Sequence, residues 1–138
     1  MPNSSDTPFA LVVDDDPLIR LDACDIITDA GFRPLEAEDV AAALGLLEQH
    51  ANDIALLFTD VQMPGGRDGF DLARETNQRW PDIKILVASG AIQPKHGDMP
   101  EEAVFVGKPF SSSVVKARLN ELFPDGEKPE PLRRQFEE

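Results

Sequence analysis

The chain has 138 residues, of which 41% are hydrophobic and 28% are charged, so it is large enough for one globular domain with a single core. Its 26 acidic residues against 13 lysines and arginines give a formal net charge of −13, which argues against direct binding to nucleic acid or to anionic membrane surfaces. Cys24 is the only cysteine, which excludes an internal disulfide framework and a cysteine-based metal site.

Residues 1–8 are polar and flanked by prolines, which predicts a flexible leader without the charged and apolar regions of a signal peptide. The run FALVV at 9–13 is short, apolar and rich in β-branched residues, which predicts a buried strand. Asp16-Pro17 then predicts the start of a helix, with Asp16 as the capping residue and the proline in the first turn. Apolar residues at helical spacing continue to Gly31, which is expected to end this helix.

The run FRPLEA at 32–37 predicts a weaker strand. Pro34 restricts this strand to the edge of a sheet, because proline cannot donate a ladder hydrogen bond. Apolar residues at helical spacing predict the next helix over 38–50. The run IALLFT at 54–59 is apolar on both faces, which is typical of a central parallel strand.

A glycine-rich loop follows, and the sequence then predicts a helix near 69–79, strands at 83–88 and 103–107, and a last helix at 112–123. The alternation of strands and helices predicts an α/β fold around a parallel sheet. Residues 124–138 are rich in proline and charge, and we expect a flexible or partner-docking tail there.

The segment GAIQPKHGDMPEE, between the last two predicted strands, is unusual for such a fold. It holds two prolines and two glycines and shows no helical periodicity. A full helix is therefore not expected between these strands.

Charged and polar residues follow four of the five predicted strands. Asp14 and Asp15 follow the first strand, Asp60 the third, Ser89 the fourth and Lys108 the fifth. Ligands of an open parallel sheet bind beyond the carboxyl ends of its strands. With the second strand at an edge, the first and third strands become neighbours, so the three aspartates are expected to converge.

Converging carboxylates repel each other, and a divalent cation relieves this repulsion. Oxygen-only ligands of this kind suit Mg²⁺, which is often shared with a phosphoryl group. The Ser89 hydroxyl can donate a hydrogen bond to a phosphoryl oxygen, and the Lys108 ammonium can pair with another. This set of groups indicates phosphoryl transfer, in which positioning and charge stabilisation carry most of the catalysis.

The blocks LVVDDDPLIR, LLFTDVQMP, ILVASG and VFVGKPF carry a family resemblance. In this order and at these spacings, the blocks resemble the signature of the response-regulator receiver domain of two-component signalling. The resemblance covers residues 9–123. It implies a doubly wound, flavodoxin-like fold with a five-stranded parallel sheet in the order 2-1-3-4-5, here with a short or absent fourth helix.

The resemblance also implies roles for the acidic residues. Asp60 matches the phosphoacceptor, which takes its phosphoryl group from a phosphohistidine. Asp15 and Asp60 match direct ligands of Mg²⁺, whereas Asp14 matches a residue that acts largely through water. Gln62 matches the position that offers its backbone carbonyl to the metal.

Three further positions match residues of the family's phosphorylation and switching machinery. Ser89 stands where the family has Thr or Ser. Lys108 matches the family's lysine, which precedes a proline across a bond that is cis in relatives. Phe105 occupies the aromatic switch position, but it lacks the hydroxyl of the more familiar tyrosine.

These matches predict a single-domain response regulator that works as a phosphorelay shuttle, a sink or a protein-binding switch. We expect a phosphoacceptor with slow self-dephosphorylation, not an enzyme. The expected partners are a sensor histidine kinase or histidine phosphotransfer protein and a downstream protein of unknown identity, in the cytoplasm, without nucleic acid or membrane. A homodimer stays open, although the short segment after Ser89 argues against the family's usual dimer face, which includes the fourth helix.

Two alternatives stay open at the level of sequence. Asp14-x-Asp16 after a strand superficially matches the nucleophile and acid of haloacid dehalogenase-like phosphohydrolases, although no later acidic pair completes that family's pattern. A receiver-like binding module that no longer uses phosphate is the other alternative. Separate Asp14→Asn and Asp60→Asn substitutions distinguish the receiver from the hydrolase, and absence of Mg²⁺ binding would favour the binding module.

Overall fold

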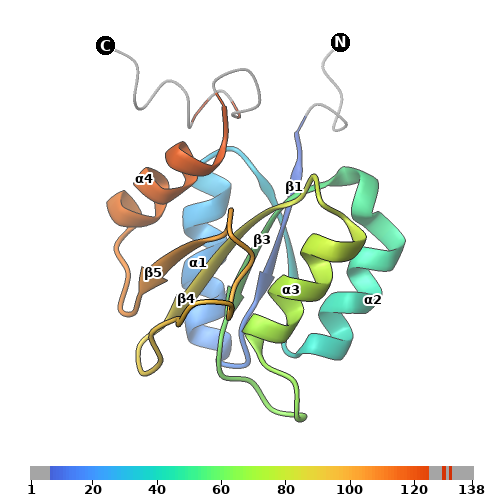
Figure 1. The fold of residues 1–138 in the computed structure, drawn as a ribbon. Helices are drawn as coiled ribbons and strands as arrows, with labels where there is room; N and C mark the ends of the chain where they lie inside the picture. The colour runs from blue at the N-terminus through green and yellow to red at the C-terminus, as the bar shows by residue number, and fades with distance from the viewer. Residues whose placement is uncertain (1–6, 125–128, 130, 132–138) are drawn as a thin grey trace.

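The computed structural model describes residues 7–124, 129 and 131 (Figure 1). Apart from its last two residues, the predicted leader lies outside the described residues, and so does most of the predicted tail. The elements are β1 (Phe9–Val13), α1 (Pro17–Asp29), β2 (Arg33–Ala37), α2 (Val40–His50), the 3₁₀ turn η2 (Ala51–Asp53), β3 (Ile54–Asp60), α3 (Gly69–Arg79), β4 (Lys84–Ser89), β5 (Val104–Gly107) and α4 (Ser112–Leu122).

The five strands form one sheet in the order β2-β1-β3-β4-β5, and every neighbouring pair is parallel. This confirms the predicted α/β fold and strand order. β2, which contains Pro34, is an edge strand, and β1 and β3 are neighbours. All carboxyl ends of the strands therefore lie along one edge of the sheet.

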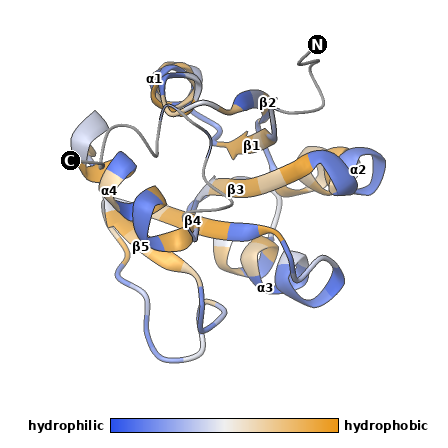
Figure 2. Cartoon of the chain, turned by 90° about the horizontal axis from the view of Figure 1, so that it is seen from above, coloured by the Kyte–Doolittle hydropathy of each residue, from blue (hydrophilic) through white to orange (hydrophobic). Residues whose placement is uncertain are grey.

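The sheet separates two apolar cores. Because strand side chains alternate between faces, Ala10 and Val12 of β1 pack on the side of α1 and α4, whereas Leu11 and Val13 pack on the side of α2 and α3. Figures 1 and 2 show these two helix pairs on opposite faces of the sheet. The strands are apolar on both faces because helices cover both.

Each of the helices α1 to α4 begins with a side-chain cap at the edge of the sheet where the strands end. Asp16 caps α1, Asp39 caps α2 and Ser111 caps α4, each by accepting a hydrogen bond from a backbone N–H in the first turn. Asp68 and Asp71 form a reciprocal capping box at the start of α3. The caps fix how the chain turns from each strand end into the next helix.

Several element ends differ from the predicted ones by one or two residues. The helix predicted from residue 38 begins at Val40, because Asp39 is its cap in an extended conformation. β3 continues through Asp60, which pairs with Ala88 of β4. α4 ends at Leu122 because Phe123 is extended.

The β4–β5 loop (residues 90–103) contains turns and bends but no helix, as predicted. Its Ile92 and Met99 are partly buried and pack against the core on the side of α2 and α3, as does Phe105 of β5. Two apolar side chains of the loop thus contribute to the cover of that core. Within the part of the chain that the structure describes, no helix has both the length and the apolar character needed to cross a membrane.

Candidate functional site

The three predicted metal-ligating aspartates lie together. Asp14 and Asp15 follow β1, and Asp60 is the last residue of β3, the strand beside β1. One carboxylate oxygen of each aspartate lies within 4.8 Å of the others. We refer to Asp14, Asp15 and Asp60 as the acid cluster.

Lys108 binds two members of the acid cluster. Its Nζ donates to Asp14 Oδ2 and to Asp60 Oδ1, both at 2.9 Å. The peptide bond from Lys108 to Pro109 is cis, as the resemblance implied. The lysine therefore supplies one positive charge to a site with three negative ones.

Burial differs among these groups. The Asp14 and Asp60 side chains are 7% and 9% exposed, whereas Asp15 lies at the surface. Burial raises the pKa of Asp60 above its ordinary value, although the hydrogen bond and charge of Lys108 act in the opposite direction. Burial alone would lower the pKa of Lys108, but its hydrogen bonds to Asp60 and Asp14 outweigh burial and raise it. Lys108 thus stays an ammonium ion. Its positive charge does not fully offset the cost of burying the Asp60 carboxylate.

The chemistry of the donors fits Mg²⁺. Three carboxylates offer hard oxygen ligands close together, and exposed Asp15 leaves one side of the cluster open to water. Mg²⁺ prefers such oxygen ligands and keeps several of its waters. Gln62 is exposed in the loop after β3, and its backbone carbonyl as a further ligand stays a prediction.

Ser89 lies next to Lys108 at the carboxyl ends of β4 and β5. Ser89 is paired with Gly107 in the sheet, and the Lys108 backbone N–H donates to the Ser89 carbonyl at 3.0 Å. The Ser89 Oγ is buried and accepts a hydrogen bond from the Ile92 N–H at 3.1 Å. The hydroxyl therefore connects the edge of the site to the start of the β4–β5 loop.

Phe105 lies on β5 opposite Val87 and is half-buried. It belongs to the apolar core on the side of α2 and α3, together with Ile92 and Met99 of the loop. Its role as the switch residue stays a prediction; Phe105 and these two loop residues pack against the same apolar core.

Gly69 supports the backbone of Asp60 and was not singled out from the sequence. A Cβ on Gly69 would lie 1.9 Å from the Asp60 carbonyl oxygen, and the Gly69 N–H donates to the Val61 carbonyl at 2.7 Å. The Thr59 Oγ1 also donates to the Asp60 carbonyl, at 2.8 Å. Only glycine permits so close an approach. In the sequence, the only feature that marks Gly69 is its position directly after Asp68, the residue that caps α3.

Arg74 is a second residue that the sequence did not reveal. Its Nη1 donates to the Asp98 carbonyl in the β4–β5 loop at 2.6 Å, and its Nη2 donates to Asp71 at 2.7 Å. The loop is thus held near its start by Ser89 and near its end by α3. Arg74 contacts a backbone carbonyl of the loop and not a side chain of opposite charge, so the residue types in the sequence do not predict this contact.

An open hollow of about 250 Å³ adjoins Lys108, between α1 and the segment that connects β5 to α4. Ile19, Asp22, Pro109 and Phe110 line it together with Lys108. On the same helix, the Leu18 and Leu21 side chains are 77% and 57% exposed. An apolar surface therefore lies beside the acid cluster.

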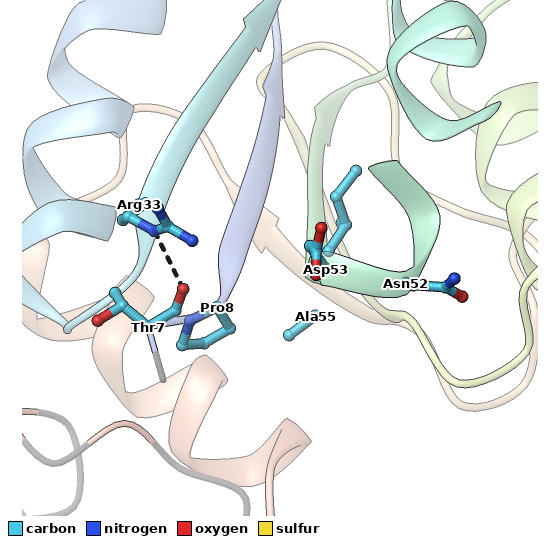
Figure 3. A pocket seen from close by; sticks show the side chains of 7 residues that line it. Thr7, Pro8, Arg33, Asn52, Asp53 and Ala55 are labelled. Atoms are coloured by element: carbon cyan, nitrogen blue, oxygen red, sulfur yellow. Dashed lines mark hydrogen bonds between the residues drawn. The ribbon is translucent and has the colours of Figure 1, made fainter. Parts of the chain in front are cut away.

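A second cavity, of about 170 Å³, lies at the opposite end of the sheet (Figure 3). It is lined by residues at the amino ends of β1, β2 and β3, among them Pro8, Arg33 and Asp53. Arg33 Nε donates to the Thr7 carbonyl at 3.1 Å in this cavity. No residue of the acid cluster contributes to it.

Comparisons with known proteins agree with this geometry. The family model for the response regulator receiver domain matches residues 10–120. The response regulator receiver protein CpdR of Brucella abortus is 32% identical over 104 residues, covering 72% of this chain and 83% of CpdR. The phosphate regulon transcriptional regulatory protein PhoB of Escherichia coli is 33% identical over 114 residues, covering 79% of this chain and 48% of PhoB. The chain thus spans about half the length of PhoB.

Among solved structures, a response regulator receiver protein from Sinorhizobium medicae superposes with a TM-score of 0.76 and 25% sequence identity. The match covers 84% of this chain and 94% of that protein. The likeness therefore extends over nearly the whole described fold.

Proposed function

Because the chain belongs to the response regulator receiver domain family, we propose that Asp60 accepts a phosphoryl group from a phosphohistidine of a sensor histidine kinase or phosphotransfer protein. The observation that carries this proposal is the contact of one lysine with Asp14 and Asp60, within reach of Asp15. The geometry joins a buried carboxylate nucleophile, an acidic metal site and a fixed positive charge.

In the proposed reaction an Asp60 carboxylate oxygen attacks phosphorus while the phosphorus–nitrogen bond of the phosphohistidine breaks. The bonding electrons stay with the imidazole, which takes up a proton, and an acyl phosphate forms on Asp60. Lys108 pairs with a phosphoryl oxygen, and the Ser89 hydroxyl donates to another. When bound, Mg²⁺ supplies positive charge that offsets the acid cluster and the phosphoryl oxygens.

The proposal describes a phosphoacceptor with slow self-dephosphorylation, not an enzyme with a separate substrate. In this proposal the protein acts as a phosphorelay shuttle, a sink or a protein-binding switch. The proposed location is the cytoplasm, where histidine kinases use ATP. Exposed Leu18 and Leu21 and the hollow beside Lys108 supply the apolar surface on which the phosphohistidine donor docks.

Phosphorylation is proposed to change the β4–β5 loop. Ser89 gives its hydrogen bond to the phosphoryl group, moves away from the Ile92 N–H and releases the start of the loop. Phe105 then repacks with Ile92 and Met99. Backbone NMR of the protein with Mg²⁺ and beryllofluoride, a phosphate mimic, tests this step. Unchanged shifts throughout the loop would reject it.

The hydrolase alternative needs Asp14 as a nucleophile and Asp16 as an acid. Asp16 Oδ1 instead accepts hydrogen bonds from the Leu18 and Ile19 N–H groups as the cap of α1, at 2.9 and 3.3 Å. Asp14 is held by Lys108 and by the Asp16 N–H. These contacts support the receiver proposal over the hydrolase.

The proposal is tested by incubating the protein with labelled phosphohistidine forms of candidate kinases and phosphotransfer proteins, in the presence of Mg²⁺. The expected result is label transfer from at least one donor to the wild type and none to Asp60→Asn. Lys84→Met, which removes a charge at the opposite end of β4 from the site, is the matched control and should accept label. Equal labelling of wild type and Asp60→Asn would overturn the proposal.

A further inference from the structure

Asp15 differs from the other two acids in how it is held. Lys108 fixes the carboxylates of Asp14 and Asp60 directly. Asp15 is exposed, and among the described residues no hydrogen bond reaches its carboxylate. The direction of the Asp15 side chain therefore depends on its backbone.

The backbone before Asp15 is held by Arg20. Arg20 Nη1 donates to the Asp14 carbonyl at 2.8 Å, and Arg20 Nε donates to Glu36 Oε1 on β2 at 3.0 Å. The Asp14 N–H in turn donates to the carbonyl of Ala37 on β2 at 3.1 Å. One guanidinium thus ties the first turn of α1 to the end of β1 and to the neighbouring strand.

The Asp14 carbonyl and the Asp15 N–H belong to one planar peptide unit. Fixing the direction of this carbonyl fixes the whole plane, and with it the backbone from which the Asp15 side chain projects. The fork of the guanidinium suits this task, because two of its N–H groups bind two partners in a set geometry.

We infer that Arg20 is a positioning residue for the metal site, which acts through the Asp14 carbonyl to direct the Asp15 carboxylate towards Asp60. This inference rests on the proposed Mg²⁺-dependent function. It assigns no contact between Arg20 and the metal. The residue raises the affinity for Mg²⁺ by keeping three carboxylates within reach of one cation.

Electrostatics predicts the opposite effect, which makes the inference testable. A positive charge near an acidic site repels a divalent cation. If charge were the only effect of Arg20, its removal would therefore strengthen Mg²⁺ binding. If Arg20 acts by positioning, its removal weakens Mg²⁺ binding even though the site becomes more negative.

The experiment measures the Mg²⁺ dissociation constant of the full chain by calorimetry and by the NMR shifts of the Asp15 and Asp60 amides, without any phosphoryl donor. Arg20→Met is expected to weaken binding about tenfold, the lower end of the loss seen when partners of metal ligands are removed. Arg20→Lys loses the fork but keeps one group that can donate to the Asp14 carbonyl, so it should retain part of the positioning and weaken binding by a smaller factor.

Arg33→Met is the matched control. Arg33 also donates to a backbone carbonyl, that of Thr7, but it lies at the amino end of β2, away from the acid cluster. Its loss should leave the Mg²⁺ dissociation constant within about twofold. Thermal unfolding without Mg²⁺ shows whether each variant is folded. If Arg20→Met is unfolded, the test uses Arg20→Lys in its place.

The outcomes separate the inference from the proposed function. Mg²⁺ binding by Arg20→Met and Arg20→Lys at wild-type strength or tighter overturns the role of Arg20 and leaves the phosphoacceptor proposal intact. Equal weakening by Arg33→Met also overturns it, because the effect would then be general. Absence of Mg²⁺ binding by the wild type overturns both this inference and the metal part of the proposed function.

Discussion

Lys108 lies 48 residues after Asp60 in the sequence, yet its ammonium is 2.9 Å from Asp60 Oδ1. The same ammonium contacts Asp14 Oδ2, so it binds two of the three carboxylates that a metal ion would also bind. A bound metal ion would therefore compete with the Lys108 ammonium for the negative charge of these carboxylates.

Replacing Lys108 with methionine should change Mg²⁺ binding and phosphorylation of Asp60 in opposite directions. Mg²⁺ binding should become stronger, by about tenfold, because a competing cation is removed from a mostly buried site. Phosphorylation should become slower, because the charge that pairs with a phosphoryl oxygen is lost. Calorimetry and a labelling time course measure the two effects. The exposed Lys95→Met is the control with the same change of net charge, and similar effects there would contradict this account.

Gly69→Ala should disturb the site through its backbone. The added Cβ would lie 1.9 Å from the Asp60 carbonyl oxygen, so either α3 or the end of β3 must shift. We expect a loss of about 1–3 kcal/mol in the free energy of unfolding, together with slower phosphorylation. Denaturant titration measures the first effect and labelling the second.

Gly45→Ala is the control for this substitution. Gly45 lies in α2, and a Cβ there would meet no atom within 4 Å. Alanine should stabilise the helix by up to about 1 kcal/mol. If Gly69→Ala were as stable and as active as Gly45→Ala, the proposed backbone contact would not support Asp60.

Arg74→Met should loosen the β4–β5 loop before any phosphorylation. Its guanidinium is the contact from α3 to the Asp98 carbonyl. We expect faster amide hydrogen exchange at loop residues near Asp98, with exchange in β4 unchanged. Arg79→Met is matched, because Arg79 also lies on α3 and pairs with two acids, Glu75 and Glu48, but not with the loop. Equal exchange in the two variants would show that Arg74 does not hold the loop.

Cys24 should give the protein a distinct loss of stability in alkaline solution. It lies on the buried face of α1, and burial raises its pKa from 9.0 to about 11. Between these values the native thiol keeps a proton that the unfolded thiol has lost. The free energy of unfolding therefore falls as the pH rises through this range, by about 1–3 kcal/mol.

Urea titrations at about pH 8 and about pH 10.5, on wild type and Cys24→Ala, measure this loss. Other titrating groups contribute equally to both proteins, so the difference between them reports on the thiol. The wild type should lose more stability than the variant over this interval. Parallel losses would contradict the burial effect.

Much of the fold followed from local patterns. Pro34 restricts its strand to an edge of the sheet, and this placement alone predicts that Asp14, Asp15 and Asp60 lie at neighbouring strand ends, as they do. Two prolines and two glycines in one segment predicted the missing helix after Ser89. These features are encoded by residue type and spacing, which sequence shows directly.

The supports of the site could not be predicted in the same way. Arg20 and Arg74 act on backbone carbonyls, which every residue carries, so the identity of the partner leaves no trace in the sequence. Gly69 is needed for a close approach between segments, a distance that only the folded chain defines. Each of these residues was visible in the sequence, but its contact was not.

The central claim is that Asp60 is the phosphoacceptor of a Mg²⁺-dependent site. It is tested most directly by treating the protein with acetyl phosphate and Mg²⁺, trapping the acyl phosphate with borohydride and locating the reduced residue by peptide mass spectrometry. The account predicts reduction at Asp60 alone, abolished by a chelator. Reduction at Asp14, or at Asp60 to the same extent with the chelator present, would contradict it.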